Sequence, residues 1–481
     1  VGGGIAALSA GWRLQQTGFE DFKLLELERE PGGTSRSGSS SVSSYPWGAH
    51  YVPLPQPSNK ALRRLFAEMS VFEPGAEGSS YPVVAEHVLC REPQERLFAK
   101  GQWFAGLFPH SIASDDDLRQ WEAFGTEIKR WIDWRDLEGR PAFTIPVANC
   151  SHDEEVVRLD KISMSDWLQE KGWTSEPLRW WVDYSCRDDY GLTVDQTSAW
   201  AGLFYFAARI DRSEDGEQPL LTWPEGNGRI VDHLVDKLGA HVESGQAVVS
   251  VEPPTRGDEG QTKVVVFDVK TRSIRGLLAD QVIFAVPQFL APYLIRGLSP
   301  ERKQVSKAFK YGAWVVANLH LSERPHETGI PLSWDNVLYD SSSLGYVVAT
   351  HQVGSDFGPT VWTWYLPLCD PLPADARRKL LDLKWEHWAE VVLSDLEVAH
   401  PEIRELVERL DVMHWGHAMI QPRPGFVWSK ERQAAAKPVG PVHFAGTDLS
   451  GVALMEEAFY HGVRSAEEVL TARETHFSSV L

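Results

Sequence analysis

The first residues of the chain limit its possible folds more than any other stretch, because Gly2, Gly4 and Ala7 have the spacing Gly-x-Gly-x-x-Ala. In a strand–turn–helix unit the first glycine permits a tight turn and the second lets the backbone approach a diphosphate. The third, small residue lets the helix and strand pack closely. Ile5 and Leu8 begin a helical pattern of apolar residues, and free amides at the start of such a helix bind phosphate. The segment therefore predicts a Rossmann-like nucleotide-binding domain.

The next residues extend this pattern beyond that of a simple nicotinamide-binding protein. Residues 22–26 read as a second strand, and Glu26 lies about 20 residues beyond the glycines, where a carboxylate accepts hydrogen bonds from ribose hydroxyls. A second glycine pair, Gly32 and Gly33, follows. Because glycines of this kind normally come after a buried strand and only Val1 precedes them, we expect further residues upstream, where any targeting signal would lie.

Charge and composition narrow the class of partner. The 481 residues include 47 Lys plus Arg and 67 Asp plus Glu, a formal net charge of −20, which disfavours nucleic acid and anionic membranes as partners. Four cysteines without CxxC spacing predict neither a metal site nor a disulfide framework. No apolar run reaches the ~18–20 residues of a membrane span. We therefore expect a soluble protein with a small-molecule substrate and no membrane anchor, either cytoplasmic or exported in folded form.

Three separate segments resemble signature motifs of the flavin-containing amine oxidase superfamily, which includes monoamine and polyamine oxidases, protoporphyrinogen oxidase and phytoene desaturases. The amino-terminal motif covers residues 2–38. The middle motif comprises residues 223–228, 248–251 and 280–287, and the carboxy-terminal motif comprises 443–448, 450–451, 455–458 and 462–466. The motifs occur in the family's order and cover both ends and the middle of the chain. The resemblance implies an FAD-dependent oxidoreductase.

The same resemblance implies an α/β fold of the glutathione-reductase/amine-oxidase type. A Rossmann-like FAD-binding domain would be assembled from residues 1–60, 215–297 and 435–473. A discontinuous, mixed α+β substrate domain would comprise residues 61–214 and 298–434. In the substrate domain, apolar periodicity predicts helices at 161–173, 198–209 and 374–396, and strands at 314–321, 346–351 and 360–366.

The resemblance also implies which residues hold FAD. Asp448 would bind the ribityl chain, Val248 would hold the adenine through its main chain, and Met455 would open a helix whose amides face the flavin O2 side. Reduced flavin gathers negative charge there, which a helix dipole stabilises. The predicted cofactor residues are Gly2, Gly4, Ala7, Glu26, Gly32, Gly33, Arg36, Gly48, Ala49, His50, Val248, Gly446, Asp448 and Met455. No cysteine occupies the position used for covalent attachment, so noncovalent FAD is expected.

The chain departs from the family at positions close to the reacting ring. The lysine that amine oxidases usually carry near flavin N5 is replaced by Val315 or Val316. The two aromatic-cage tyrosines would be replaced by His443 and Trp428. Because imidazole titrates near neutral pH, His50, His417 and His443 are the predicted proton-handling residues, with a purely structural role as the alternative for each.

The resemblance implies oxidation of an amine C–N bond by hydride transfer to flavin N5, with O2 or another acceptor taking the electrons. The polar cluster at residues 187–191 would bind a substrate ammonium, or else cap a helix or form a surface ion pair. The absent lysine leaves two alternatives open. One is desaturation or isomerisation of a C–C bond in an apolar substrate, and the other is a low-turnover flavoprotein that assists maturation of a partner.

Overall fold

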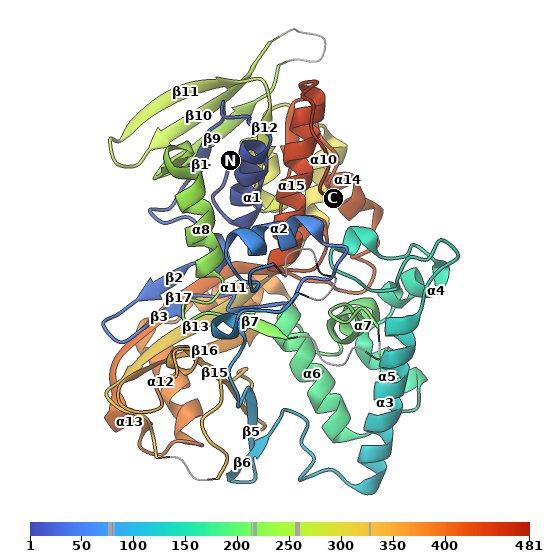
Figure 1. Ribbon diagram of the computed structural model, residues 1–481, viewed down its shortest axis with the longest axis vertical. Helices are drawn as coiled ribbons and strands as arrows, with labels where there is room; N and C mark the ends of the chain where they lie inside the picture. Colours follow the sequence, from blue (N-terminus) through green and yellow to red (C-terminus); the bar gives the residue numbers. More distant parts are fainter. Residues whose placement is uncertain (76–78, 80–81, 213, 215–218, 255–259, 327–328) are drawn as a thin grey trace.

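The computed structural model describes residues 1–75, 79, 82–212, 214, 219–254, 260–326 and 329–481. One half of the molecule surrounds the amino terminus and contains the segments predicted to bind a nucleotide, and we call it the nucleotide-binding half. The other half has helices on one side and a large sheet on the other (Figure 1). The mixed α/β class is as predicted. The residue limits of the two domains stay predictions, and residue 215, where one limit is predicted, lies outside the described residues.

The glycine-rich turn leads directly into helix α1 (Ile5–Gln16), which packs between α8 (Gly228–Leu238) and the carboxy-terminal helix α15 (Met455–Ala472). The rings of Trp12 and Phe459 lie 5.4 Å apart across the α1–α15 interface. A Cβ atom at Gly462 would lie 2.2 Å from the carbonyl oxygen of Ala6. Glycine is therefore needed at this position, because the two helix backbones touch.

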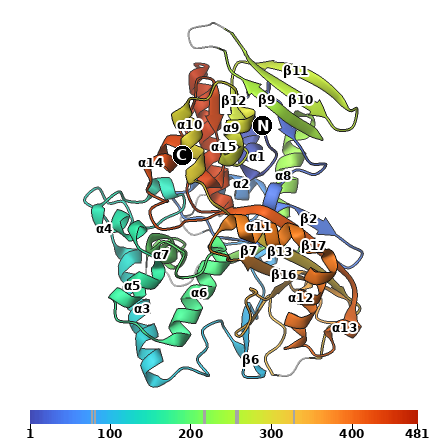
Figure 2. The same ribbon diagram turned by 180° about the vertical axis from the view of Figure 1, so that it is seen from behind.

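Short parallel strands flank the amino terminus on both sides. Strand β1 (Leu24–Glu26) pairs with β8 (Val242–Ser244), and β12 (Val282–Phe284) pairs with β18 (Val442–Phe444). The backbone at Val1 joins both pairs: its amino group donates to Ile283 O at 2.7 Å, and the amide of Gly2 donates to Leu25 O at 2.9 Å. A three-stranded antiparallel sheet covers the outer end, with order β11-β10-β9 (Figure 2). Its strands are β9 (Gln246–Glu252), β10 (Thr262–Asp268) and β11 (Ser273–Ala279).

The helical side of the second half is built on one apolar core of aromatic and aliphatic side chains. Its main helices are α3 (Asp115–Asp133), α5 (Met164–Glu170), α6 (Glu176–Tyr190) and α7 (Ala199–Ala207). The predicted helices at 161–173 and 198–209 correspond to α5 and α7. Ser114 begins α3 through a capping box with Asp117, and Ser198 caps α7 by accepting from the amide of Ala201. These hydroxyls satisfy amides that a helix leaves unpaired at its start.

The opposite side is a seven-stranded sheet with order β17-β13-β16-β15-β14-β5-β6. The strands are β5 (Glu95–Ala99), β6 (Gln102–Ala105), β13 (Tyr311–Leu321), β14 (Asp335–Leu338), β15 (Tyr346–Val348), β16 (Thr360–Leu368) and β17 (Val407–Ile420). Helices α11 (Pro373–Asp382) and α12 (Trp385–Glu397) cover one face. Alternate residues of the central strands therefore point either to these helices or to the opposite face, which carries the pocket described below.

Three features of this side differ from the sequence-based expectation. The single helix predicted at 374–396 is wrong: it is interrupted at Leu383 and Lys384, whose backbone is extended. The two resulting helices each bury their own apolar face against the sheet, through Leu380 in α11 and Trp388 in α12. Strands β5 and β6 come from residues 61–214, for which the sequence predicts only helices. Strand β17 is not predicted, because it is half exposed and carries charged residues.

The other helices and strands are short or peripheral. They are α2 (Lys60–Glu68), α4 (Glu154–Val157), α9 (Ala291–Leu294), α10 (Pro300–Val305), α13 (Ile403–Leu406), α14 (Lys430–Ala435), β2 (Ser37–Ser39), β3 (Ser44–Pro46), β4 (Tyr51–Pro53) and β7 (Leu220–Thr222). Among the described residues, no helix has the length and apolar character needed to cross a membrane.

Candidate functional site

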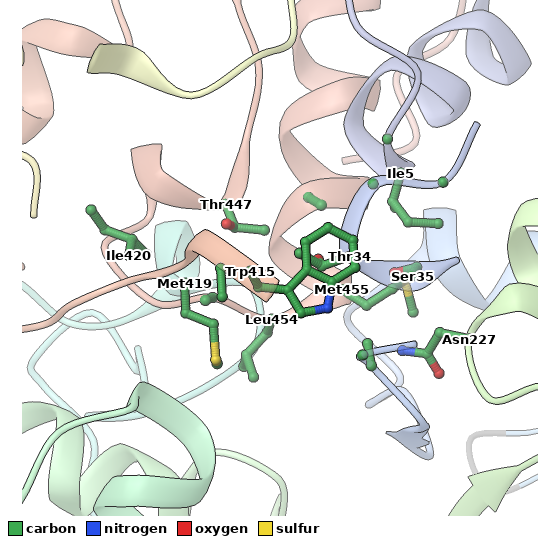
Figure 3. Close-up of a pocket in the computed structure, with 18 of the residues that line it drawn as sticks. Ile5, Thr34, Ser35, Asn227, Trp415, Met419, Ile420, Thr447, Leu454 and Met455 are labelled. Atoms are coloured by element: carbon green, nitrogen blue, oxygen red, sulfur yellow. The ribbon is translucent and has the colours of Figure 1, made fainter. Parts of the chain in front are cut away.

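One long pocket runs from the glycine-rich turn to the face of the seven-stranded sheet opposite α11 and α12. Its first part is lined by Gly2–Ala6, Glu26, residues 32–35 and the carboxy-terminal motif around Gly446 and Met455. Its second part is lined by side chains of β13, β14, β16, β17 and α6. Figure 3 shows Trp415, Leu454 and Met455 converging with Thr34 and Ser35 where the two parts meet. Segments far apart in the sequence thus form one continuous site.

The first part has the geometry that a dinucleotide diphosphate requires. Gly2 has a φ of +101°, and a Cβ there would lie 2.5 Å from Ala285 O. Gly4, by contrast, has extended backbone with no atom within 4 Å of a Cβ position, and it precedes α1 without a side-chain cap. The first-turn amides of Ile5 and Ala6 therefore face an open cradle, as a bound phosphate needs.

Glu26 ends β1 beside this cradle and is held by the glycine-rich turn. Its carboxylate accepts from the amide of Glu28 at 2.7 Å and from the amide of Gly3. Burial raises the pKa of Glu26, although these amide hydrogen bonds oppose the shift. Gly32 and Gly33 both have positive φ, and the amide of Gly32 donates to Gly3 O at 2.7 Å. The two glycine segments therefore form a single backbone unit around the predicted ribose and diphosphate positions.

Asp448 combines two hydrogen bonds to the protein with one buried oxygen that has no partner in the described chain. Its Oδ2 accepts from the hydroxyl of Tyr311 at 2.6 Å and from the amide of Gln288 at 2.9 Å. Its Oδ1 is buried without a hydrogen-bond partner in the described chain, as is Oδ1 of Asn227, and both residues line the pocket. Burial raises the pKa of Asp448. Two orphaned acceptors in one pocket fit the hydroxyl groups of a polyhydroxylated cofactor.

The segment at Gly48, Ala49 and His50 also lines the pocket and packs tightly on the second glycine region. The amide of Ala49 donates to Thr34 O at 3.0 Å, and a Cβ at Gly48 would lie 2.2 Å from the same oxygen. Nδ1 of His50 lies 3.2 Å from Gly48 O, which places the ring proton on Nδ1 because a carbonyl can only accept. Burial lowers the pKa of His50 to about 4, so the imidazole is neutral at pH 7.

The second part of the pocket is walled by alternate residues of the sheet. Val316, Trp314 and Tyr365 belong to the cluster on the pocket face, whereas Val315 belongs to the core under α11 and α12. The position predicted for the usual lysine is therefore Val316, and no lysine occurs among the described lining residues. Trp415 donates from its indole N–H to Trp47 O at 2.7 Å, which fixes the ring at the centre of the pocket.

His417 lies on the same strand as Trp415, two residues further on, and also lines the pocket. Its ring stacks on Phe289 with centroids 4.2 Å apart. Burial, together with the nearby charge of Arg377, lowers the pKa of His417 to about 4. Both pocket histidines are thus neutral at pH 7 and can accept a hydrogen bond but carry no positive charge.

Buried carboxylates gather in this second part. Asp189 accepts from Nη2 of Arg209 at 2.9 Å through both oxygens, so these two charges neutralise each other. Burial and the charge of Asp189 raise the pKa of Asp188 to about 7, and burial with the charges of Glu95 and Asp188 raises that of Asp335. Burial also raises the pKa of Glu456 to about 7, and its Oε1 has no partner within the described chain.

Two predicted catalytic residues lie elsewhere. His443 is on β18, and its ring is held between Gln281 Oε1 at 2.9 Å and Glu468 Oε2 at 3.0 Å, outside the pocket lining. The side chain of Trp428 is half-buried in the helical core, where it packs against Trp200 and His152. Neither can form an aromatic cage at the pocket, so this assignment is corrected. A motif match gives the position of a residue along the chain, but it does not reveal the direction in which the side chain points.

Three predicted cofactor residues also fall outside the lining. Ala7 is buried in the α1 core, which agrees with a packing role. Val248 lies on β9, next to β1, and is half-buried. The guanidinium of Arg36 lies 5.3 Å from the ring centre of Trp415, and its Nε is buried with no partner in the described chain. Of the three, Arg36 has the strongest sign of an unfilled contact, because a buried N–H group normally has an acceptor.

Several pocket residues were not predicted individually. Asp335, Tyr365, Trp314 and Glu456 line the pocket, and Arg209 lies with them. Alternation along β13 and β16 groups residues such as Trp314 and Tyr365 on one face of the sheet. Because both faces of these strands are apolar, the sequence does not show which face lines the pocket. In the predicted cluster at 187–191, only Asp188 and Asp189 reach the pocket. Arg187 instead pairs with Asp183 at 2.9 Å, and Gly191 ends α6 in the left-handed conformation.

Comparisons with known proteins agree with this geometry. Residues 5–470 match the profile of the family described as flavin containing amine oxidoreductase. An L-amino acid dehydrogenase of Synechocystis sp. is 25% identical over 94% of this chain and 89% of its own length. A solved putrescine oxidase bound to putrescine has a TM-score of 0.70 at 16% identity, covering 98% of each chain. A fatty acid isomerase from P. acnes that produces CLA has a TM-score of 0.68 at 15% identity, covering 98% of this chain and 97% of its own.

The structural likenesses, at such low identity, show the fold alone. The family match covers nearly the whole chain and includes both the glycine-rich turn and the carboxy-terminal motif that line the pocket. Members of the family contain a flavin, for which the orphaned acceptors and the open cradle provide a place. On these grounds the protein belongs to the flavin-containing amine oxidoreductase family.

Proposed function

We propose that the protein binds FAD noncovalently and oxidises the C–N bond of an amine, with O2 taking the electrons. The observation that carries this proposal is that the cofactor cradle continues directly into a chamber with aromatic walls and buried carboxylates. Such a chamber suits a substrate that is both apolar and cationic. The names of the amino acid dehydrogenase and of the putrescine oxidase support an amine substrate.

The proposal assigns the cofactor to residues of the first part of the pocket. Glu26 would accept from the ribose, the amides of Ile5 and Ala6 would hold the diphosphate, and Asp448 would bind the ribityl chain. The described residues that line the pocket include no cysteine, which supports noncovalent binding. When bound, FAD supplies an acceptor for the hydride on the carbon next to the amine nitrogen, and O2 then yields hydrogen peroxide.

The walls of the second part would prepare the amine for this reaction. An amine must lose its proton before it can release hydride, and an apolar chamber favours the neutral form by disfavouring the ammonium charge. Trp314, Val316 and Tyr365 provide that environment. With its ring proton on Nδ1, the neutral His50 leaves Nε2 free as an acceptor for the N–H of the substrate.

A second candidate is desaturation or isomerisation of an apolar substrate. Val316 at the usual lysine position favours it, as do the apolar lining residues Leu344 and Val347. The structural likeness to a fatty acid isomerase points the same way. The buried carboxylates favour the amine, because an apolar substrate would leave these groups without a partner.

Anaerobic mixing distinguishes the two candidates. We expect loss of the visible flavin absorbance on adding an amine from a panel of mono- and diamines, and hydrogen peroxide on readmitting air. Photoreduction of the same sample provides the control that the flavin can be reduced. If photoreduction succeeds while no amine bleaches the flavin, amine oxidation is contradicted. Bleaching or product formation with an apolar alkene precursor would then support the second candidate.

Asp448→Ala tests the proposed cofactor contact. The change removes the unpartnered Oδ1 and the acceptor of the Tyr311 hydroxyl, and hydrogen bonds to charged groups contribute about 1.5–3 kcal/mol. We therefore expect FAD to bind about 10–100-fold more weakly, measured by titrating apoprotein with FAD. Asp448→Asn keeps an oxygen of the same size, so its affinity for FAD should lie between that of Asp448→Ala and that of the natural protein. Equal affinity of Asp448→Ala and the natural protein would contradict the ribityl assignment.

A further inference from the structure

Two acidic side chains in the second part of the pocket form no ion pair within the described chain. Asp188, on α6, and Asp335, on β14, approach the chamber from opposite sides, one from the helical side and one from the sheet. The carboxylate of Asp188 has neither a hydrogen bond nor an ion pair within the described chain. Asp335 accepts a single long hydrogen bond, 3.4 Å, from the hydroxyl of Tyr184, besides a backbone amide.

The nearby cations are already engaged. Arg209 binds Asp189 through both carboxylate oxygens, and Nη1 of Arg209 donates to Tyr205 O. Arg187 pairs with Asp183 at 2.9 Å and donates to the carbonyl oxygen of Ser342. Neither guanidinium donates a hydrogen bond to Asp188 or Asp335 within the described chain, and their charges act on Asp188 without such a contact. Burial without an ion pair raises the pKa of both acids, and a bound cation would stabilise their charged forms, so the pair suits a cationic ligand.

A third carboxylate supports the same conclusion independently. Glu456 comes from α15, on the cofactor side, and is 5% exposed, yet its Oε1 is without a partner in the described chain and it lines the same pocket. It pairs with no arginine or lysine of the described chain. The chamber thus carries an excess of acidic groups on three different elements, which raises the local affinity for cations.

The remaining walls fit a cation on an alkyl chain. Tyr184 and Tyr365 line the chamber close to Asp335, and Tyr205 lies near Asp188. Aromatic faces attract ammonium groups, most strongly where water is excluded. Leu344 and Val347 supply apolar surface in the same pocket, which Val316 also lines. An ammonium held by carboxylates and rings, joined to methylene groups along an apolar wall, matches this arrangement.

Resting on the proposed amine oxidation, we infer that Asp188 and Asp335 bind a second positively charged group of the substrate, so that α,ω-diamines are preferred over monoamines. The amine that is oxidised lies at the cofactor end, and its distal ammonium lies between the two carboxylates. An α-amino acid fits less well, because its carboxylate would face Asp188 and Asp335 while Arg209 remains bound to Asp189. Binding of the distal ammonium also fixes the distance from the reacting carbon to the cofactor.

The test compares the holoenzyme's kcat/KM for α,ω-diaminoalkanes with that for n-alkylamines of equal length. Because charge-assisted hydrogen bonds are strong, we expect the diamine to be favoured by about 10–100-fold. Asp188→Asn and Asp335→Asn keep the shape of each side chain and should each remove most of this ratio. The ratio compares two substrates of one variant, so general damage to the site cancels. Asp195→Asn, an exposed acid of the same helical region, should leave the ratio unchanged.

A ratio near one in the natural protein, or a ratio that both variants preserve, would overturn the inference while leaving amine oxidation intact. If no amine reduces the flavin, the proposed function fails separately, and the diamine is then not consumed. Isothermal titration calorimetry of the holoenzyme with the same diamine would then measure the subsite directly. Binding that is lost in both asparagine variants supports the subsite, and absence of binding to the natural protein overturns it.

Discussion

A Gly4→Val variant is expected to fold normally and to lose FAD. The backbone of Gly4 is extended, with φ −78° and ψ 179°, a region that β-branched residues adopt readily. No atom lies within 4 Å of its Cβ position, so the side chain meets no protein group and instead projects into the cradle. Because the methyl groups block the approach of the diphosphate to the α1 amides, we expect FAD binding to weaken on the order of 100-fold, about 2.7 kcal/mol.

The measurement is the ratio of flavin absorbance to protein absorbance after purification, with circular dichroism to establish folding. Gly125→Val is a matched control, because Gly125 lies in α3 and likewise has no atom within 4 Å of a Cβ. This control should purify with full flavin content. Retention of FAD by Gly4→Val would show that the diphosphate does not lie over the start of α1, and would remove the basis for the cofactor placement.

Arg13→Met is expected to lower the free energy of unfolding by about 3 kcal/mol, since breaking a buried ion pair leaves an uncompensated charge. Nε of Arg13 donates to Glu467 Oε1 at 2.9 Å, and the side chains of the pair are 3% and 10% exposed. Nη2 of Arg13 also donates to Ser478 O. The pair joins α1 to α15 and to the carboxy-terminal segment, far along α1 from the glycine-rich turn.

Urea denaturation followed by circular dichroism measures this effect. Arg119→Met removes an exposed pair on α3, with side chains 69% and 63% exposed, and should change the stability by less than about 1 kcal/mol. The double variant Arg13→Met/Glu467→Leu should recover much of the loss, because replacing both charges leaves none unpaired. A loss in the double variant as large as in Arg13→Met would show that packing, rather than charge, explains the effect.

Much of the nucleotide-binding half follows from local sequence rules. The spacing of Gly2, Gly4 and Ala7 predicts the turn and helix α1 because each position has a steric requirement that few residues meet. Strand β1 and Glu26 follow at the distance expected, and Gly32 and Gly33 have the positive φ that glycine permits. Strands β13 and β16 are predicted because their residues are apolar on both faces, as buried strands are.

Other elements depend on distant parts of the chain. Strand β17 carries charged residues and is half exposed, so its own sequence does not identify it, yet it forms the edge of the sheet by pairing with β13. The break between α11 and α12 has no proline or glycine to mark it. Leu380 and Trp388 lie on the two separate helices, and both pack into the same core against the sheet. In both cases tertiary packing overrides the local pattern.

For the candidate site, the spacing of the glycines and of Glu26 predicts the cradle residues, and the family resemblance adds Asp448; all of these line the pocket. Tertiary structure decides the second part of the pocket. It removes His443 and Trp428, because a motif does not state which way a side chain points, and it brings together Asp188, Asp335 and Glu456 from three elements. The physical reason is that backbone turns are set by neighbouring residues, whereas the charge balance of a buried chamber depends on every element that surrounds it.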